Sequence, residues 1–114
     1  MSNEIFKGKH MILVTKEILR KTPPLYAQEE KHPDKIKVTA KFFTPTGPAT
    51  WYMTELDPET GTAFGWCDLG MGCPELGYFN INELASIDLP LGLGIERDRH
   101  FTATLGEVMD GVRR

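Results

Sequence analysis

Apolar residues occupy every second position between residues 35 and 42 of this chain. Ile36, Val38, Ala40 and Phe42 alternate with Lys35, Lys37, Thr39 and Lys41. Successive side chains of an extended strand point to opposite faces. The alternation therefore predicts a strand with one buried and one exposed face, on which Ile36, Val38 and Phe42 are mostly buried.

A second strand is predicted over residues 50–56, which are rich in aromatic and β-branched residues, with Trp51 mostly buried. The next five residues, from Asp57 to Gly61, are typical of an exposed tight turn, because Pro58 fixes a negative φ and Gly61 permits a positive one. This turn predicts a hairpin into a third strand over residues 62–69. A short strand is predicted over residues 75–79, and a further strand over residues 95–101.

Capping signals predict three short helices, over residues 16–21, over residues 81–86 and from residue 105. Two of them begin with the spacing of a capping box, in which the cap side chain and a glutamate three residues later each accept from a backbone N–H. The residues that carry these signals are Thr15, Pro23, Pro24, Asn80, Glu83, Thr104 and Glu107.

Together these elements predict an α+β protein, with an antiparallel sheet of four or five strands and short helices packed on one side. A chain of 114 residues is long enough for one hydrophobic core, so residues 1–114 are expected to form a single domain. Residues 1–10 have little to bury and are expected to lack fixed structure.

Charge is unevenly distributed along the chain. Between Lys41 and Arg97 there is no lysine, arginine or histidine, while the same stretch holds eight acidic residues and eight of the eleven aromatic ones. Such a composition is typical of a recognition surface. The acidic residues are Glu55, Asp57, Glu59, Asp68, Glu75, Glu83, Asp88 and Glu96.

Several classes of protein are disfavoured. No apolar run is long enough to span a membrane and no signal-peptide pattern is present, so a soluble cytoplasmic protein is expected. A pI near 5.6 disfavours a nucleic-acid binder, although Trp51, Tyr52, Trp66 and Tyr78 are residues that can stack on bases. Cys67 and Cys73 lack the spacing of a zinc knuckle or redox pair.

An ordered series of short motifs resembles the bacterial family catalogued as domain of unknown function 2958. The motifs are Pro23-Pro24-Leu25-Tyr26, Lys41-Phe42-Phe43-Thr44-Pro45, Thr50-Trp51-Tyr52, Glu55 with Asp57-Pro58, Glu75-Leu76-Gly77-Tyr78-Phe79 and Ile95-Glu96-Arg97-Asp98. The resemblance spans roughly residues 14–108. It implies a protein carried on plasmids or integrative elements, and it implies no established activity, cofactor or catalytic residue.

Two functions remain open for the acidic stretch. The first is a small non-catalytic interaction module that binds a basic host protein surface, with Trp51, Tyr52, Glu55, Asp57, Glu59, Glu75 and Tyr78 as the binding surface. Acidic residues would steer the encounter and aromatic residues would anchor it. The alternative is a metal-dependent hydrolase or nuclease built on Glu55, Asp57, Asp68 and Glu75, with His100 as an extra ligand.

The interaction module is the leading interpretation, and it is expected to need no metal and no cofactor. The sequence does not indicate an oligomeric state.

One structural pair is also predicted. Glu55 shares a strand face with the apolar residues Trp51 and Met53, so its carboxylate needs a partner if it is buried. In the strand predicted over residues 95–101, Arg97 shares a face with the apolar residues Ile95 and Phe101, so its guanidinium is the expected partner of Glu55. This pairing would place residues 95–101 next to residues 50–56.

Overall fold

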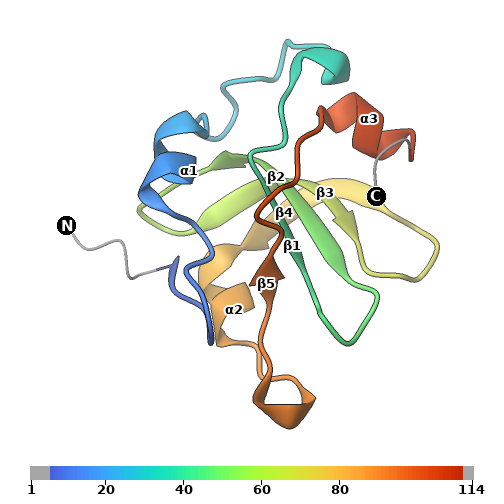
Figure 1. Ribbon diagram of the computed structural model, residues 1–114. Helices are drawn as coiled ribbons and strands as arrows, with labels where there is room; N and C mark the ends of the chain where they lie inside the picture. The colour runs from blue at the N-terminus through green and yellow to red at the C-terminus, as the bar shows by residue number, and fades with distance from the viewer. Residues whose placement is uncertain (1–5, 112–114) are drawn as a thin grey trace.

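The computed structural model describes residues 6–111, which form a five-stranded antiparallel sheet with three short α-helices (Figure 1). The spatial order of the strands is β4-β3-β2-β1-β5. In chain order the elements are α1 (Lys16–Lys21), η2 (Pro33–Lys35), β1 (Ala40–Phe43), β2 (Thr50–Leu56), β3 (Thr62–Asp68), β4 (Glu75–Asn80), α2 (Ile81–Ser86), η3 (Pro90–Gly92), β5 (Glu96–Arg97) and α3 (Leu105–Met109). The predicted α+β fold class is confirmed.

The β2–β3 hairpin has the predicted turn. Asp57 accepts hydrogen bonds from the backbone N–H of Glu59 at 3.0 Å and from the hydroxyl of Thr60 at 3.1 Å. Gly61 has φ of 82°, which a residue with a Cβ adopts only with strain. The turn residues 58–60 are exposed, as predicted, whereas Gly61 is buried.

The three helices begin where their caps predict. The side chain of Thr15 accepts from the N–H of Ile18, and that of Asn80 accepts from Asn82 and Glu83. At α3 both halves of the capping box are present, between Thr104 and Glu107. These helices are five or six residues long, too short to be stable alone, so their apolar faces must pack on the sheet.

The sheet has apolar residues on both faces. The larger core packs α1 and α2 against one face, and it includes Phe42, Met53 and Leu56 from the sheet. A smaller core lies on the opposite face, where Val108 of α3 packs with Val38 and Tyr52. The helices therefore cover both faces of the sheet, whereas the sequence predicted helices on one side (Figure 1).

Residues 35–42 do not form one continuous strand. Ile36, Val38 and Phe42 are buried as predicted, but Val38 belongs to the smaller core and Phe42 to the larger one. The N–H of Val38 donates to Ala103 and the N–H of Leu105 donates to Ile36, so this segment pairs with residues 103–105 before β1 begins. The alternation thus predicted correctly which residues are buried. It placed Val38 on the same face as Phe42, which is wrong, because the chain pairs with residues 103–105 at Val38 and with β2 at Phe42. Trp51, also expected to be mostly buried, is half-buried.

The first described residue, Phe6, belongs to the core. Phe6 is 2% exposed, and the N–H of Leu13 donates to its carbonyl oxygen at 2.8 Å. Phe6, which lies in the lead that was expected to lack fixed structure, thus packs in the core, and residues 1–5 lie outside the described part. Among residues 6–111, no helix has both the length and the apolar character needed to cross a bilayer.

Candidate functional site

Glu55, near the end of β2, is a buried carboxylate held by backbone N–H groups. It is 6% exposed. Its Oε1 accepts from the N–H of Tyr26 at 2.8 Å, and its Oε2 accepts from the N–H of Gln28 at 3.0 Å. Tyr26 has φ of 71°, an unusual value for a residue with a side chain. Glu55 thus holds the segment after Pro24 against the sheet in a strained turn.

A β-bulge turns Glu55 away from the larger core. Met53 is opposite Gly65 of β3 but Glu55 is opposite Phe64, so Thr54 is an additional residue in β2. Because one additional residue reverses the side-chain alternation, Glu55 lies on the face opposite to Met53. The prediction that Glu55 shares a face with Trp51 and Met53 is corrected by this bulge.

The predicted pair between Glu55 and Arg97 is not formed. Arg97 is opposite Phe42 at the outer edge of the sheet, so β5 pairs with β1 and not with β2. Its guanidinium donates to the carbonyl oxygen of Ile12, with the Nη2 atom at 3.2 Å. Partial burial, followed by the nearby charge of Arg99, lowers the pKa of Arg97. The two residues therefore lie on opposite faces of the sheet and have separate partners.

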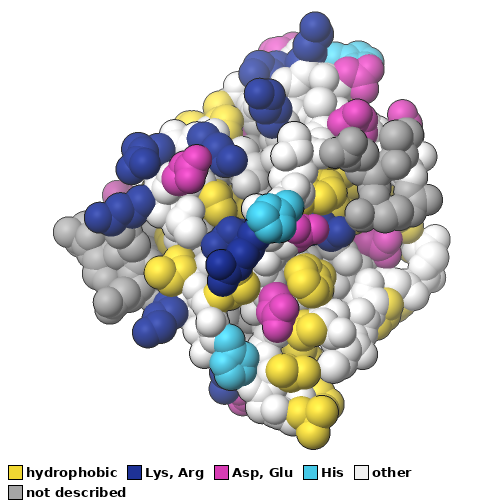
Figure 2. All heavy atoms as spheres, in the orientation of Figure 1, with side chains coloured by type: hydrophobic (Ala, Val, Ile, Leu, Met, Phe, Trp, Pro, Cys, Tyr) yellow, Lys and Arg dark blue, Asp and Glu magenta, His cyan; other side chains and the backbone are white. Residues whose placement is uncertain are grey.

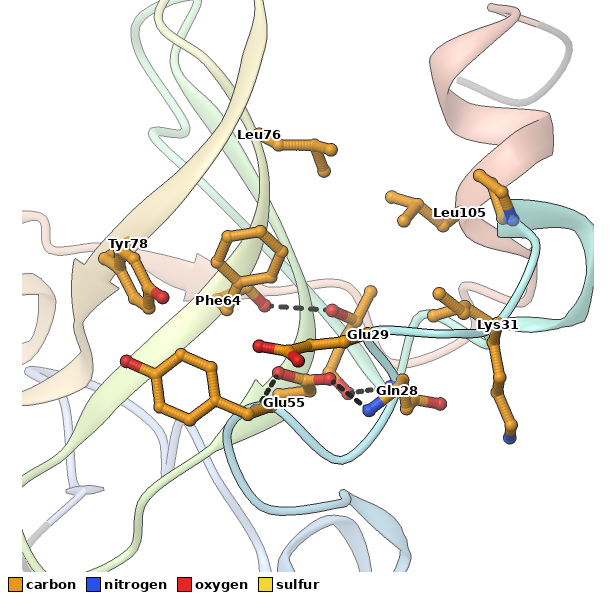
Figure 3. Close-up of a pocket in the computed structure, with 12 residues that line it drawn as sticks. Gln28, Glu29, Lys31, Glu55, Phe64, Leu76, Tyr78 and Leu105 are labelled. Carbon is orange, nitrogen blue, oxygen red and sulfur yellow. Dashed lines mark hydrogen bonds between the residues drawn. The ribbon is translucent and has the colours of Figure 1, made fainter.

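Glu55 lines a pocket of about 290 Å³ between the segment after Pro24 and the sheet. The sheet contributes Phe64, Leu76 and Tyr78, and α3 contributes Leu105. Figure 3 shows Glu29 and Glu55 extending beneath Phe64 toward the side on which Tyr78 lies. The pocket thus has apolar walls with two carboxylates at one side.

Three aromatic rings stand together at this pocket. The ring of Tyr78 is 5.0 Å from that of Phe64 and 6.5 Å from that of Tyr26 between centroids, and both contacts are edge-to-face. Tyr26 and Tyr78 remain 59% and 55% exposed, so their rings form the rim. The pKa of Tyr78 is raised, chiefly by a hydrogen bond to Tyr26. Desolvation and the charges of Glu55 and Glu29 raise this pKa further.

Within the described part of the chain, the two carboxylates of this pocket have no cationic partner. Among residues 6–111, neither Glu29 nor Glu55 forms an ion pair. Lys31 also lines the pocket, but its side chain extends away from both carboxylates in Figure 3. Lysine and arginine side chains gather instead over α1, which exposes Lys16, Arg20 and Lys21 (Figure 2). The pocket is therefore locally negative.

Of the seven residues predicted to form a binding surface, Glu55 and Tyr78 meet at this pocket. Trp51 packs against the larger core. Tyr52 is buried beside Phe101, and the Nζ atom of Lys41 is 5.8 Å from its ring centre. The predicted surface is therefore only partly assembled by the fold.

The predicted grouping of Glu75 with Glu55, Asp57 and Glu59 is also corrected. Asp57 and Glu59 lie in the turn before β3, whereas Glu75 is opposite Cys67, five residues farther along β3 than Thr62. At roughly 3.3 Å per residue, this places Glu75 about 16 Å from the turn end of the sheet. The antiparallel return of β4 causes this separation.

A metal site on the acidic stretch has no support in the described part of the chain. Residues 6–111 contain no group of three or more His, Cys, Asp or Glu side chains able to hold an ion. Cys67 and Cys73 are free thiols that line a shared pocket with Glu75. Burial, followed by the charge of Glu75, raises the pKa of the Cys67 thiol.

Sequence reasoning missed the contribution of residues 26–31 to the site. Tyr26 and Glu29 lie outside the acidic stretch, in a segment without a regular period. A signal was present in Pro23-Pro24, which ends α1 and forces a turn, followed by an aromatic residue and by Glu29 and Glu30.

The fold and the pocket define a small α+β protein with an acidic, aromatic-lined pocket. Residues 13–107 match the model of the DUF2958 family, described as a protein of unknown function, and the chain belongs to this family. No curated protein and no solved structure matches the chain.

Proposed function

We propose that this protein is a small non-catalytic interaction module of a plasmid or integrative element, and that it binds a basic surface of a host protein in the cytoplasm. The binding face is the pocket face, formed by Tyr26, Glu29, Glu55, Phe64 and Tyr78. The observation that supports this proposal is an aromatic-lined pocket with two carboxylates that form no ion pair with any of residues 6–111.

The chemistry of the pocket face suits a positively charged partner. Acidic side chains accelerate encounter with a basic surface, and the partly exposed rings of Tyr26 and Tyr78 provide apolar contact area once the partner has docked. Glu55 is fixed by two backbone N–H groups, so it requires little reordering on binding.

Affinity capture from a host lysate tests the proposal. The full chain is compared with a pocket variant, Glu29→Gln with Tyr78→Leu, and with a control variant, Glu83→Gln with Leu91→Ala. The control also removes one charge and reduces one exposed apolar side chain, but at positions outside the pocket face.

The expected result is a captured protein with a basic surface that the wild type and the control retain, that raised salt releases, and that the pocket variant loses. Retention by the pocket variant, or retention that salt does not weaken, would contradict the proposed function.

A further inference from the structure

We propose that the pocket between Glu55 and Tyr78 receives the side chain of a single arginine from the partner. This inference rests on the proposed function and specifies the group that the pocket face recognises. The size of the pocket is the first argument. Whole ligands usually occupy pockets of roughly 300–1,000 Å³. A pocket of about 290 Å³ is at the small end of that range and has room for one long side chain.

The acceptors are arranged for a cation that donates several hydrogen bonds. Each oxygen of Glu55 accepts one N–H from the backbone and keeps capacity for a second donor. Glu29 supplies another carboxylate on the same side of the pocket (Figure 3). A guanidinium has five N–H donors in a planar fork and can engage both carboxylates, whereas an ammonium group offers three donors from one point.

The walls also favour arginine over lysine. The rings of Phe64, Tyr78 and Tyr26 line the pocket and contact one another edge-to-face. A guanidinium packs favourably on aromatic rings and is more weakly hydrated than an ammonium, so it loses less on entering apolar surroundings. Leu76 and Leu105 can contact the aliphatic stem of the same side chain.

The test is an NMR titration of the full chain with three blocked tripeptides that differ only in the central residue, which is arginine, citrulline or lysine. The reporters are the backbone amides of Tyr26 and Gln28, which donate to Glu55. The arginine peptide is expected to shift both amide resonances. Citrulline has nearly the same shape without the charge and is expected to leave them in place. The lysine peptide is expected to bind at least about threefold more weakly than the arginine peptide.

Equal binding of the citrulline peptide, equal or tighter binding of the lysine peptide, or an arginine titration that moves neither amide would overturn the assignment. Glu29→Gln is expected to weaken arginine binding about five- to tenfold, since it removes one charge-assisted acceptor. Glu30→Gln is the matched control, because Glu30 is the adjacent exposed acid and does not line the pocket. Equal losses in the two variants would overturn the pocket assignment, because they would reflect net charge alone.

The outcomes separate this inference from the proposed function. If the pocket variant loses its captured partner but the arginine peptide does not bind, the interaction role stands and the arginine assignment fails. If the peptide binds at the pocket and no basic protein is captured, the assignment stands and the proposed role in binding a host protein fails.

Discussion

Glu55 on β2 and Tyr26 in the segment after α1 are joined by a 2.8 Å hydrogen bond across 29 residues of sequence. The bond runs from a backbone N–H to a buried carboxylate, and a parallel bond from Gln28 completes the contact. The side chain of Glu55 therefore attaches the wall of the pocket to the sheet, and the side-chain amide of Gln28 adds a hydrogen bond to the carbonyl oxygen of Thr54 at 3.2 Å.

Replacing Glu55 with Gln is expected to destabilise the fold by about 1–3 kcal/mol, because the new amide nitrogen faces an N–H donor and leaves it unsatisfied. Arg97→Ala is expected to cost less than about 1 kcal/mol, since the guanidinium is only partly buried. Denaturant unfolding of both single variants and the double variant provides the measurement. Because the two side chains do not interact, their losses should add, and a coupling above about 0.5 kcal/mol would contradict the separate partners described above.

Gly65 is expected to be intolerant of any side chain. A Cβ atom at this position would lie 1.7 Å from the carbonyl oxygen of Tyr52 on the neighbouring strand. Gly65→Ala is expected to destabilise the protein by at least about 3 kcal/mol, because backbone atoms of β2 would have to move. Gly77 is directly opposite Gly65 on β4 and has open space around it. Gly77→Ala should therefore be nearly neutral in the same thermal or denaturant unfolding experiment, and similar losses at both positions would argue against this close approach.

Tyr78 is expected to ionise above the ordinary tyrosine value near 10, because its pKa is raised chiefly by hydrogen bonding to Tyr26. A raised folded-state pKa means that the folded protein holds the proton more tightly. The contribution to stability is thus present below pH 10 and is lost as the pH rises through the folded pKa. Tyr26→Phe should lower the Tyr78 pKa, as measured by ultraviolet absorbance of the phenolate against a Tyr78→Phe reference. An unchanged titration would show that Tyr26 does not stabilise the protonated form.

The two thiols are expected to differ in reactivity. Cys73 is exposed, whereas Cys67 is half-buried and has a raised pKa, so less of it is thiolate near neutral pH. A thiol reagent at pH 7.5 should therefore react in two phases, a fast one at Cys73 and a slow one at Cys67. The single variants Cys67→Ser and Cys73→Ser show which thiol gives rise to each phase. Glu75→Gln should accelerate the slow phase by removing a nearby negative charge. If Cys67 reacts first, the burial described here is incorrect.

The sequence by itself determined the local elements of this protein. The β2–β3 turn follows from Pro58 and Gly61, and the starts of α2 and α3 follow from Asn80 and Thr104, because turns and caps depend on residues adjacent in the chain. The burial of alternate residues from Ile36 to Phe42 also followed from their pattern.

Only the tertiary structure decided how these elements combine into a site. The one-residue bulge at Thr54 places Glu55 on the face opposite to Met53, and the pattern of hydrophobic residues does not predict such an insertion. The choice of β1 as the partner of β5 depends on long-range pairing, and β1 therefore lies between the strand of Arg97 and the strand of Glu55. The pocket itself forms because a segment without regular period folds back to give Glu55 its hydrogen bonds, and a buried carboxylate can be stable only where such partners converge in space.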